Sequence, residues 1–233
     1  MFLDRFHSIQ DGRVVISADQ ASHFAREVAG DYNPIHNPDH RRFCVPGDLL
    51  FALVVWRFGL SQNMTFQFRN LLGGDVALNF NENPDGSIDV CDTNGKRYLE
   101  VTRSGDQTSD ETVIEKFTRC YVAASGKNFP YTLKPLMESK GVMFNPDRPM
   151  VIYESMSVSL DHIDAPNPGL ELNASILEVV GKRGNCTLEY GLTSDHQPIG
   201  TVIKKLVVSG LREYDAGVMD RIVTEFYRLK DGA

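Results

Sequence analysis

The chain has 233 residues, with 24 basic and 31 acidic side chains, so its formal net charge is −7. A hydrophobic fraction of 42% and a charged fraction of 24% are typical of a globular protein. The length fits one large domain or two domains of about 110 residues each. An acidic balance without a stripe of Lys and Arg argues against nucleic-acid binding.

Two further global features exclude a membrane span and a disulfide framework. The longest apolar run, residues 49–56, is far shorter than the roughly 20 residues that cross a bilayer. The N-terminus lacks a basic segment followed by an apolar one, so we expect no signal peptide. The four cysteines are scattered without a CxxC pair, which is typical of reduced, buried thiols in the cytoplasm.

The first half predicts two helices separated by a turn-rich loop. Apolar residues at helical spacing predict a helix over 19–30, capped by Ser17 or Asp19. After the loop, the segment 46–60 is apolar on every face, and Gly59 can end it. A helix without a polar face has no side for water, so this segment should be enclosed.

Alternating segments after this helix predict the sheet that encloses it. Apolar and polar residues alternate around Phe66, around Leu78, and on both sides of the Asn94-Gly95 pair. Asn-Gly between alternating runs is a strong hairpin signal. One face of these strands is apolar, so we expect a curved sheet wrapped around one buried helix.

The second half repeats this order of elements. We expect a shorter apolar helix within 129–143, strands around residues 156–160, 172–176, 186–192 and 199–208, and an amphipathic helix over 215–229. The sequence AGDYNP at 29–34 is echoed by SGKNFP at 125–130. We interpret this as an internal duplication with domains at 1–110 and 111–233. Pairing two such sheets would cover their open edges.

The first half resembles the MaoC-like hydratases of the hotdog fold. The resemblance is carried by FA at 24–25, GDYNPIH at 30–36, PG at 46–47 and FRNLLGGD at 68–75, and it covers about residues 15–105. It implies an α+β double hotdog, with two curved antiparallel sheets each wrapped around a central helix. The whole chain is also similar to a bacterial family without an assigned function.

The resemblance also implies a reaction and its residues. Asp31 and His36 would act on the water that adds to a 2-enoyl thioester, and Asn33 would shape the loop between them. Gly47 would donate its N–H to the thioester carbonyl. The enzyme would be a lyase in fatty acid metabolism, with coenzyme A or acyl carrier protein holding the acyl group and no metal or other cofactor.

This chemistry is also sensible from the residues alone. A histidine is nearly neutral at pH 7 and can take a proton from water, while a nearby carboxylate holds the same water. The N-terminus of a buried helix offers unpaired N–H groups and the positive end of the helix dipole. One such donor can contribute about 3 kcal/mol to transition-state stability.

The chain departs from the family pattern at three positions. Pro38 and Pro46 replace an acidic residue and a histidine of the family, and Asp48 adds a charge where the family is apolar. We predict that Asp48 caps the helix, where it would compete with the substrate oxygen. In the second half Lys127 replaces the acid and no histidine follows, so that half should only shape an acyl pocket.

Two other interpretations of the function remain open at this level. Asp48 could serve a thioesterase as its carboxylate, or the chain could bind acyl thioesters without turnover. A metal site at His36 and His40 is not expected, because Pro38 breaks the helix that would align them. The protein could be a monomer or a homodimer, since a double hotdog can pair its own halves.

Overall fold

A single curved antiparallel sheet forms the frame of the molecule. The computed structural model describes residues 2–147 and 150–232. Ten strands pair in the order β1-β2-β4-β5-β6-β3-β8-β11-β10-β9. Their bounds are β1 (Ser8–Gln10), β2 (Arg13–Val15), β3 (Leu60–Phe68), β4 (Leu78–Glu82), β5 (Ile88–Asp92), β6 (Arg97–Thr108), β8 (Val151–Leu160), β9 (Pro168–Val180), β10 (Arg183–Ser194) and β11 (Gln197–Ser209).

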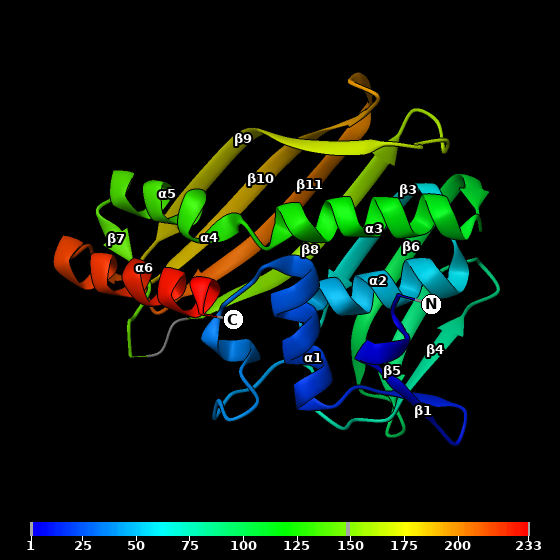
Figure 1. Cartoon of the computed structure of the whole chain (residues 1–233), viewed down its shortest axis with the longest axis horizontal. Helices are drawn as coiled ribbons and strands as arrows, with labels where there is room; N and C mark the ends of the chain where they lie inside the picture. Colours follow the sequence, from blue (N-terminus) through cyan, green and yellow to red (C-terminus); the bar gives the residue numbers. More distant parts are fainter. Residues whose placement is uncertain (1, 148–149, 233) are drawn as a thin grey trace.

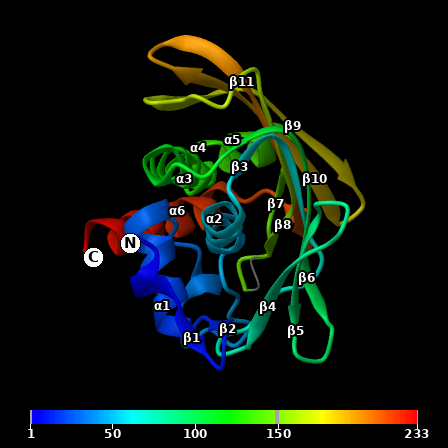
Figure 2. The same ribbon diagram turned by 90° about the vertical axis from the view of Figure 1, so that its right-hand side faces the viewer.

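Helices cover the concave face of this sheet (Figure 2). Two further short strands, β7 (Val142–Met143) and β12 (Arg212–Glu213), pair with each other. The helices and helical turns are η1 (Asp4–Phe6), α1 (Ala18–Phe24), η2 (Ala25–Ala29), η3 (Pro34–His36), α2 (Gly47–Phe58), α3 (Glu111–Ser125), α4 (Asn128–Tyr131), α5 (Leu133–Ser139) and α6 (Ala216–Asp231). Within the described ranges, no helix combines the length and the apolar character that crossing a membrane requires.

Helix α2 is the enclosed helix that the sequence predicts. Residues 48–55 are all buried, and Gly59 ends the helix with a φ of +85°. The sheet curves around α2 (Figure 2), and α3 lies beside it (Figure 1). The expected hairpin at Asn94-Gly95 is present between β5 and β6. Buried apolar side chains from both halves form one continuous core.

The two expected sheets are joined into one by the pairing of β3 with β8. Met64 lies opposite Val158 in that antiparallel pair, so the strands of the first half continue directly into those of the second. This covers one edge of each half-sheet, as edge strands require. The architecture is the double hotdog of the α+β class that the sequence predicts, while the domain limits of 1–110 and 111–233 stay a prediction.

The structure corrects the expected helix of the second half. The segment that follows the expected limit at residue 110 forms the long helix α3, which was not predicted and which packs on α2 and β9. Asp110 caps it by accepting hydrogen bonds from the N–H groups of Thr112 and Val113. The segment 129–143 forms two short helices and β7 instead of one helix.

Candidate functional site

The loop that carries the candidate acid begins at a helix end. Ser17 caps the start of α1 in a reciprocal capping box with Gln20. The helix continues directly into the π-helical turn η2. Gly30 follows with a φ of +64°, a left-handed conformation that glycine adopts without steric cost. The N–H of Asp31 donates back to the Ala25 carbonyl at 2.8 Å, so the helix end fixes where this residue lies.

Asn33 and Asp31 shape the next turn through their side chains. Asp31 Oδ1 accepts from the N–H of Asn33 at 2.8 Å, and Asn33 Oδ1 accepts from the N–H of Ile35 at 3.2 Å. Asn33 thereby caps the short turn η3, where Pro34 occupies the first position. These two hydrogen bonds hold the loop in shape, and the turn carries His36 at its end.

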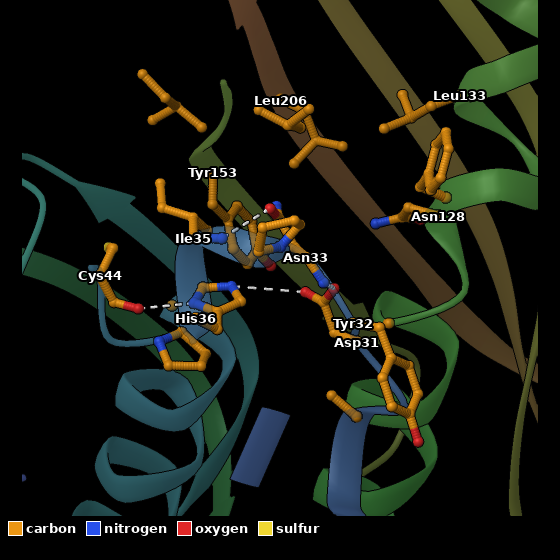
Figure 3. Close-up of a pocket in the computed structure, with 18 of the residues that line it drawn as sticks. Asp31, Tyr32, Asn33, Ile35, His36, Cys44, Asn128, Leu133, Tyr153 and Leu206 are labelled. Atoms are coloured by element: carbon orange, nitrogen blue, oxygen red, sulfur yellow. Dashed lines mark hydrogen bonds and ion pairs between the residues drawn. The ribbon is translucent and has the colours of Figure 1, made fainter. Parts of the chain in front are cut away.

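Asp31 and His36 face each other on the wall of a cavity (Figure 3). His36 Nε2 lies 3.6 Å from Asp31 Oδ2, and their side chains are 13% and 29% exposed. His36 Nδ1 lies 2.6 Å from the Cys44 carbonyl oxygen. A carbonyl can only accept, so Nδ1 carries a proton, and Nε2, the nitrogen directed at Asp31, is the one that can act as a base.

The N-terminus of α2 opens onto the same cavity. Pro46 occupies the N-cap position and offers no side-chain cap, so the first N–H groups of the helix keep no intrahelical acceptor. Gly47 is the first helical residue and lines the cavity. A Cβ at this position would lie 2.9 Å from Tyr153 Cδ1 and 3.0 Å from Phe68 Cε1, so only glycine lets these rings approach the helix end.

Asp48 does not cap the helix, contrary to the prediction from sequence. Its side chain is directed instead to the end of α3, where Oδ2 accepts a 2.5 Å hydrogen bond from Ser125 Oγ. The residue is only 7% exposed, and Oδ1 has no hydrogen-bond partner among the described residues. The carboxylate therefore does not occupy the N–H groups at the start of α2.

A buried lysine forms a polar cluster with Asp48 and Ser125, and it was not predicted from the sequence. Lys204 of β11 is 3% exposed, and its Nζ donates to Ser125 Oγ. It also lies 4.2 Å from the centre of the Tyr153 ring. A signal was present, because Lys204 stands between Val202 and Leu206 at the inward phase of the alternation.

Burial shifts the pKa of both charged groups in the cluster. Loss of water raises the pKa of Asp48, and the nearby Lys204 and the Ser125 hydrogen bond oppose that rise. Loss of water likewise lowers the pKa of Lys204, and the charges of Asp48 and Asp31 oppose it. Each group therefore supports the charged form of the other.

Aromatic hydroxyls surround this cluster on the side of the second half. The hydroxyls of Tyr121 and Tyr153 share a hydrogen bond, and Tyr190 donates to Asn128 Oδ1 at 2.8 Å. Burial raises the pKa of all three phenols, so they stay neutral donors. Asn128 belongs to the segment that echoes the motif of the first half.

One cavity of about 890 Å³ brings all five candidate residues together. This volume is typical of a small-molecule site. Most of its wall is apolar and comes from both halves, including Leu50, Phe68, Phe129, Leu133, Leu206 and Phe226. Helix α6 closes one side, where the Phe226 ring contacts the rings of Tyr32 and Phe129. Asp31, Asn33, His36, Gly47 and Asp48 all line this cavity, as do Ser125 and Lys204.

Comparison with known proteins gives one family and several distant folds. The family described as "Protein of unknown function (DUF3581)" matches residues 1–217. No curated protein matches the sequence. Similar solved structures include a MaoC-like dehydratase, with 10% identity and a TM-score of 0.43 over 88% of this chain and 98% of that one.

Two other solved structures show the same degree of similarity. The acyl-CoA thioesterase II TesB2 from Mycobacterium marinum has 6% identity and a TM-score of 0.43, over 93% of this chain and 99% of that one. The dehydratase domain of RzxB from Pseudomonas fluorescens has 9% identity and a TM-score of 0.42, over 89% and 98% of the two chains.

Proposed function

The chain belongs to the family of unknown function DUF3581, and from that starting point we propose that it catalyses the reversible hydration of 2-enoyl thioesters. The observation that carries this proposal is the placement of Asp31 and His36, 3.6 Å apart on the wall of one cavity. That cavity also contains the N-terminus of α2 at Gly47. A base, an acid and a helix end are what the addition of water to an enoyl thioester needs.

The cavity fits an acyl thioester better than a polar metabolite. Its volume of about 890 Å³ and its largely apolar wall suit an acyl chain. Asp31, His36 and the start of α2 line this cavity together, and the thioester would react there. Coenzyme A or acyl carrier protein would hold the acyl group through its thiol.

The proposed reaction uses His36 as the base. A water held between Asp31 Oδ2 and His36 Nε2 gives a proton to Nε2 while its oxygen bonds to Cβ of the substrate. The electron pair of the double bond moves to the carbonyl oxygen, which forms an enolate. The imidazolium, stabilised by the Asp31 carboxylate, then returns the proton to Cα, so that H and OH have been added across the bond.

Gly47 is proposed to bind the enolate oxygen. Its N–H belongs to the first turn of a buried helix, where the helix dipole favours negative charge. Because Asp48 is bonded to Ser125 and not to this helix end, no side chain of the helix competes for that N–H. The hydrogen bond between Asp48 and Ser125 therefore supports the proposed reaction.

The proposal is tested by following the loss of enoyl absorbance for short-, medium- and long-chain 2-enoyl-CoA substrates. Asp31→Asn and His36→Ala should each reduce kcat/KM by about a hundredfold or more, with unfolding transitions close to wild type. Asp39→Asn and His40→Ala are matched controls, because these residues of the same loop do not line the cavity. Wild-type rates in both Asp31→Asn and His36→Ala would remove the assignment.

The Asp48 carboxylate favours thioester hydrolysis as a second candidate. This acid is buried at the cavity, and its Oδ1 has no partner in the described part of the chain, so it could direct a water at the thioester. Hydrolysis releases free thiol from a saturated acyl thioester, and hydration does not. A thiol-reactive dye therefore separates the two reactions, and binding without either product would indicate a protein that only carries acyl thioesters.

A further inference from the structure

A buried ammonium group lies inside the candidate site, and the proposed hydration does not use it. Lys204 is 3% exposed and lines the same cavity as His36 and Gly47. Lysine is almost never fully buried unless it is paired, because removing its charge from water is costly. An inward lysine between Val202 and Leu206 therefore needs a specific role.

The contacts of Lys204 leave part of its donor capacity unused. An ammonium group has three N–H donors. One points to Ser125 Oγ, and Nζ lies 4.2 Å from the centre of the Tyr153 ring. Ser125 Oγ in turn donates a hydrogen bond to Asp48 Oδ2 at 2.5 Å. The Asp48 carboxylate therefore balances the charge of Lys204 through Ser125, without a direct contact. No other hydrogen bond of Nζ is present among the described residues.

The Tyr153 ring places this ammonium close to the start of α2. The face of the ring is in contact with Lys204 Nζ, and its Cδ1 edge lies against Gly47, where even a Cβ would be only 2.9 Å away. Residue 48, which follows Gly47, is joined to Lys204 through Ser125. Lys204 and Gly47 therefore both lie against the Tyr153 ring, and both line the cavity.

We propose that Lys204 donates a hydrogen bond to the thioester carbonyl oxygen, together with the Gly47 N–H. This inference rests on the proposed binding of an acyl thioester and assigns a catalytic residue to the second half of the chain. Negative charge grows on that oxygen as the enolate forms, and a nearby ammonium in a water-poor cavity stabilises it strongly. Asp48 then acts as a positioning residue that keeps Lys204 charged.

The test compares two ligands that differ only at the carbonyl. A saturated acyl-CoA and its thioether analogue, in which CH2 replaces C=O, are titrated calorimetrically and undergo no hydration. Wild-type protein should prefer the thioester by about tenfold or more, the effect of one charge-assisted hydrogen bond. Lys204→Met should bind both ligands within about threefold of each other, because it loses the charged donor to the carbonyl and keeps only the weaker, neutral N–H of Gly47.

Two control variants keep the test decisive. Lys205→Met removes the exposed neighbouring lysine of β11 and should keep the wild-type preference. The double variant Asp48→Asn/Lys204→Met also removes the buried carboxylate that Lys204→Met would leave without a balancing charge. If Lys204→Met unfolds, this double variant provides a folded protein without the ammonium. A wild-type preference retained in the variants without Lys204, or no preference in wild type, would overturn the inference.

The outcome is separable from that of the hydration assay. If enoyl thioesters are not hydrated but the carbonyl preference depends on Lys204, the carbonyl site stands and the proposed reaction fails. If hydration occurs and the preference does not depend on Lys204, the reaction stands and this inference fails. Absence of binding of both ligands to wild type would overturn both.

Discussion

Gly126 lies directly against the backbone of Ala29, so that a Cβ on Gly126 would be 1.8 Å from the Ala29 carbonyl oxygen. These two residues belong to the segments 29–34 and 125–130, which resemble each other in sequence. The contact holds the end of α3, with Ser125, against the loop that carries Asp31. The site is therefore assembled at a junction where these two segments meet.

Replacing Gly126 should open this junction. The atoms that Gly126→Ala would meet are backbone atoms of Ala29, which cannot rotate away as a side chain can. We expect a loss of more than about 3 kcal/mol in the free energy of unfolding, measured by urea denaturation. Gly73→Ala is the control, because no atom lies within 4 Å of its added Cβ. Equal stability of the two variants would contradict the role given to this contact.

Gly47→Ala should disturb the aromatic wall at the start of α2. The new methyl group would press on the rings of Tyr153 and Phe68, at 2.9 Å and 3.0 Å, and the Tyr153 ring is also held by Lys204 and Tyr121. We expect a loss of about 1 to 2 kcal/mol in unfolding free energy, as for overpacked cores. The hydration rate should fall with it. Unchanged stability would indicate that the rings yield freely.

Asp48→Asn should make stability rise with pH. The variant loses the carboxylate that opposes the lowering of the Lys204 pKa. Between that lowered pKa and the unfolded value of 10.5, the unfolded chain holds the extra proton, so the free energy of unfolding increases with pH. Urea denaturation should show a smaller deficit relative to wild type at about pH 9.5 than at about pH 7.

Lys204→Met should show the opposite dependence. Without the ammonium, the pKa of Asp48 is raised further above its usual value of 3.8. Above pH 3.8 the folded protein then holds the extra proton, so the free energy of unfolding falls as pH rises through this window. The double variant Asp48→Asn/Lys204→Met should have neither slope. Parallel pH profiles for the two single variants would show that these groups are not coupled.

The thiol at the cavity should resist alkylation. Burial raises the pKa of Cys44 and of Cys186 to about 11, so little thiolate exists near neutral pH. We expect iodoacetamide at about pH 8 to modify the partly exposed Cys91 before either of them, as followed by mass spectrometry of peptides. Urea should remove the difference, and faster labelling of Cys44 in the native protein would contradict its burial.

Local signals in the sequence predicted much of the fold. The alternating runs became strands, the apolar segment 46–60 became α2, and the Asn94-Gly95 pair formed its hairpin. Helix α3 was missed, although the sequence contains its signals. Asp110 can cap the helix, and Ile114, Phe117 and Tyr121 follow it at helical spacing. The helix is buried against α2, a packing contact that the local sequence does not reveal.

The partner of Asp48 could not be found in the same way. A carboxylate at the second position of a helix commonly interacts with the helix end, and nothing local to residue 48 argues against this. Ser125 lies 77 residues further along the chain and bonds to Asp48 only because α3 packs against α2. The local preference is overridden by a contact between the two halves.

The sequence by itself determined most of the elements of this protein and the loop that holds Asp31 and His36, because both depend on residues close together in the chain. Only the tertiary structure decided that Lys204 lies at the same cavity. Its strand β11 pairs with β8, and β8 with β3, which brings a distant inward side chain to the start of α2. Such register depends on packing between elements far apart in sequence, which no local pattern encodes.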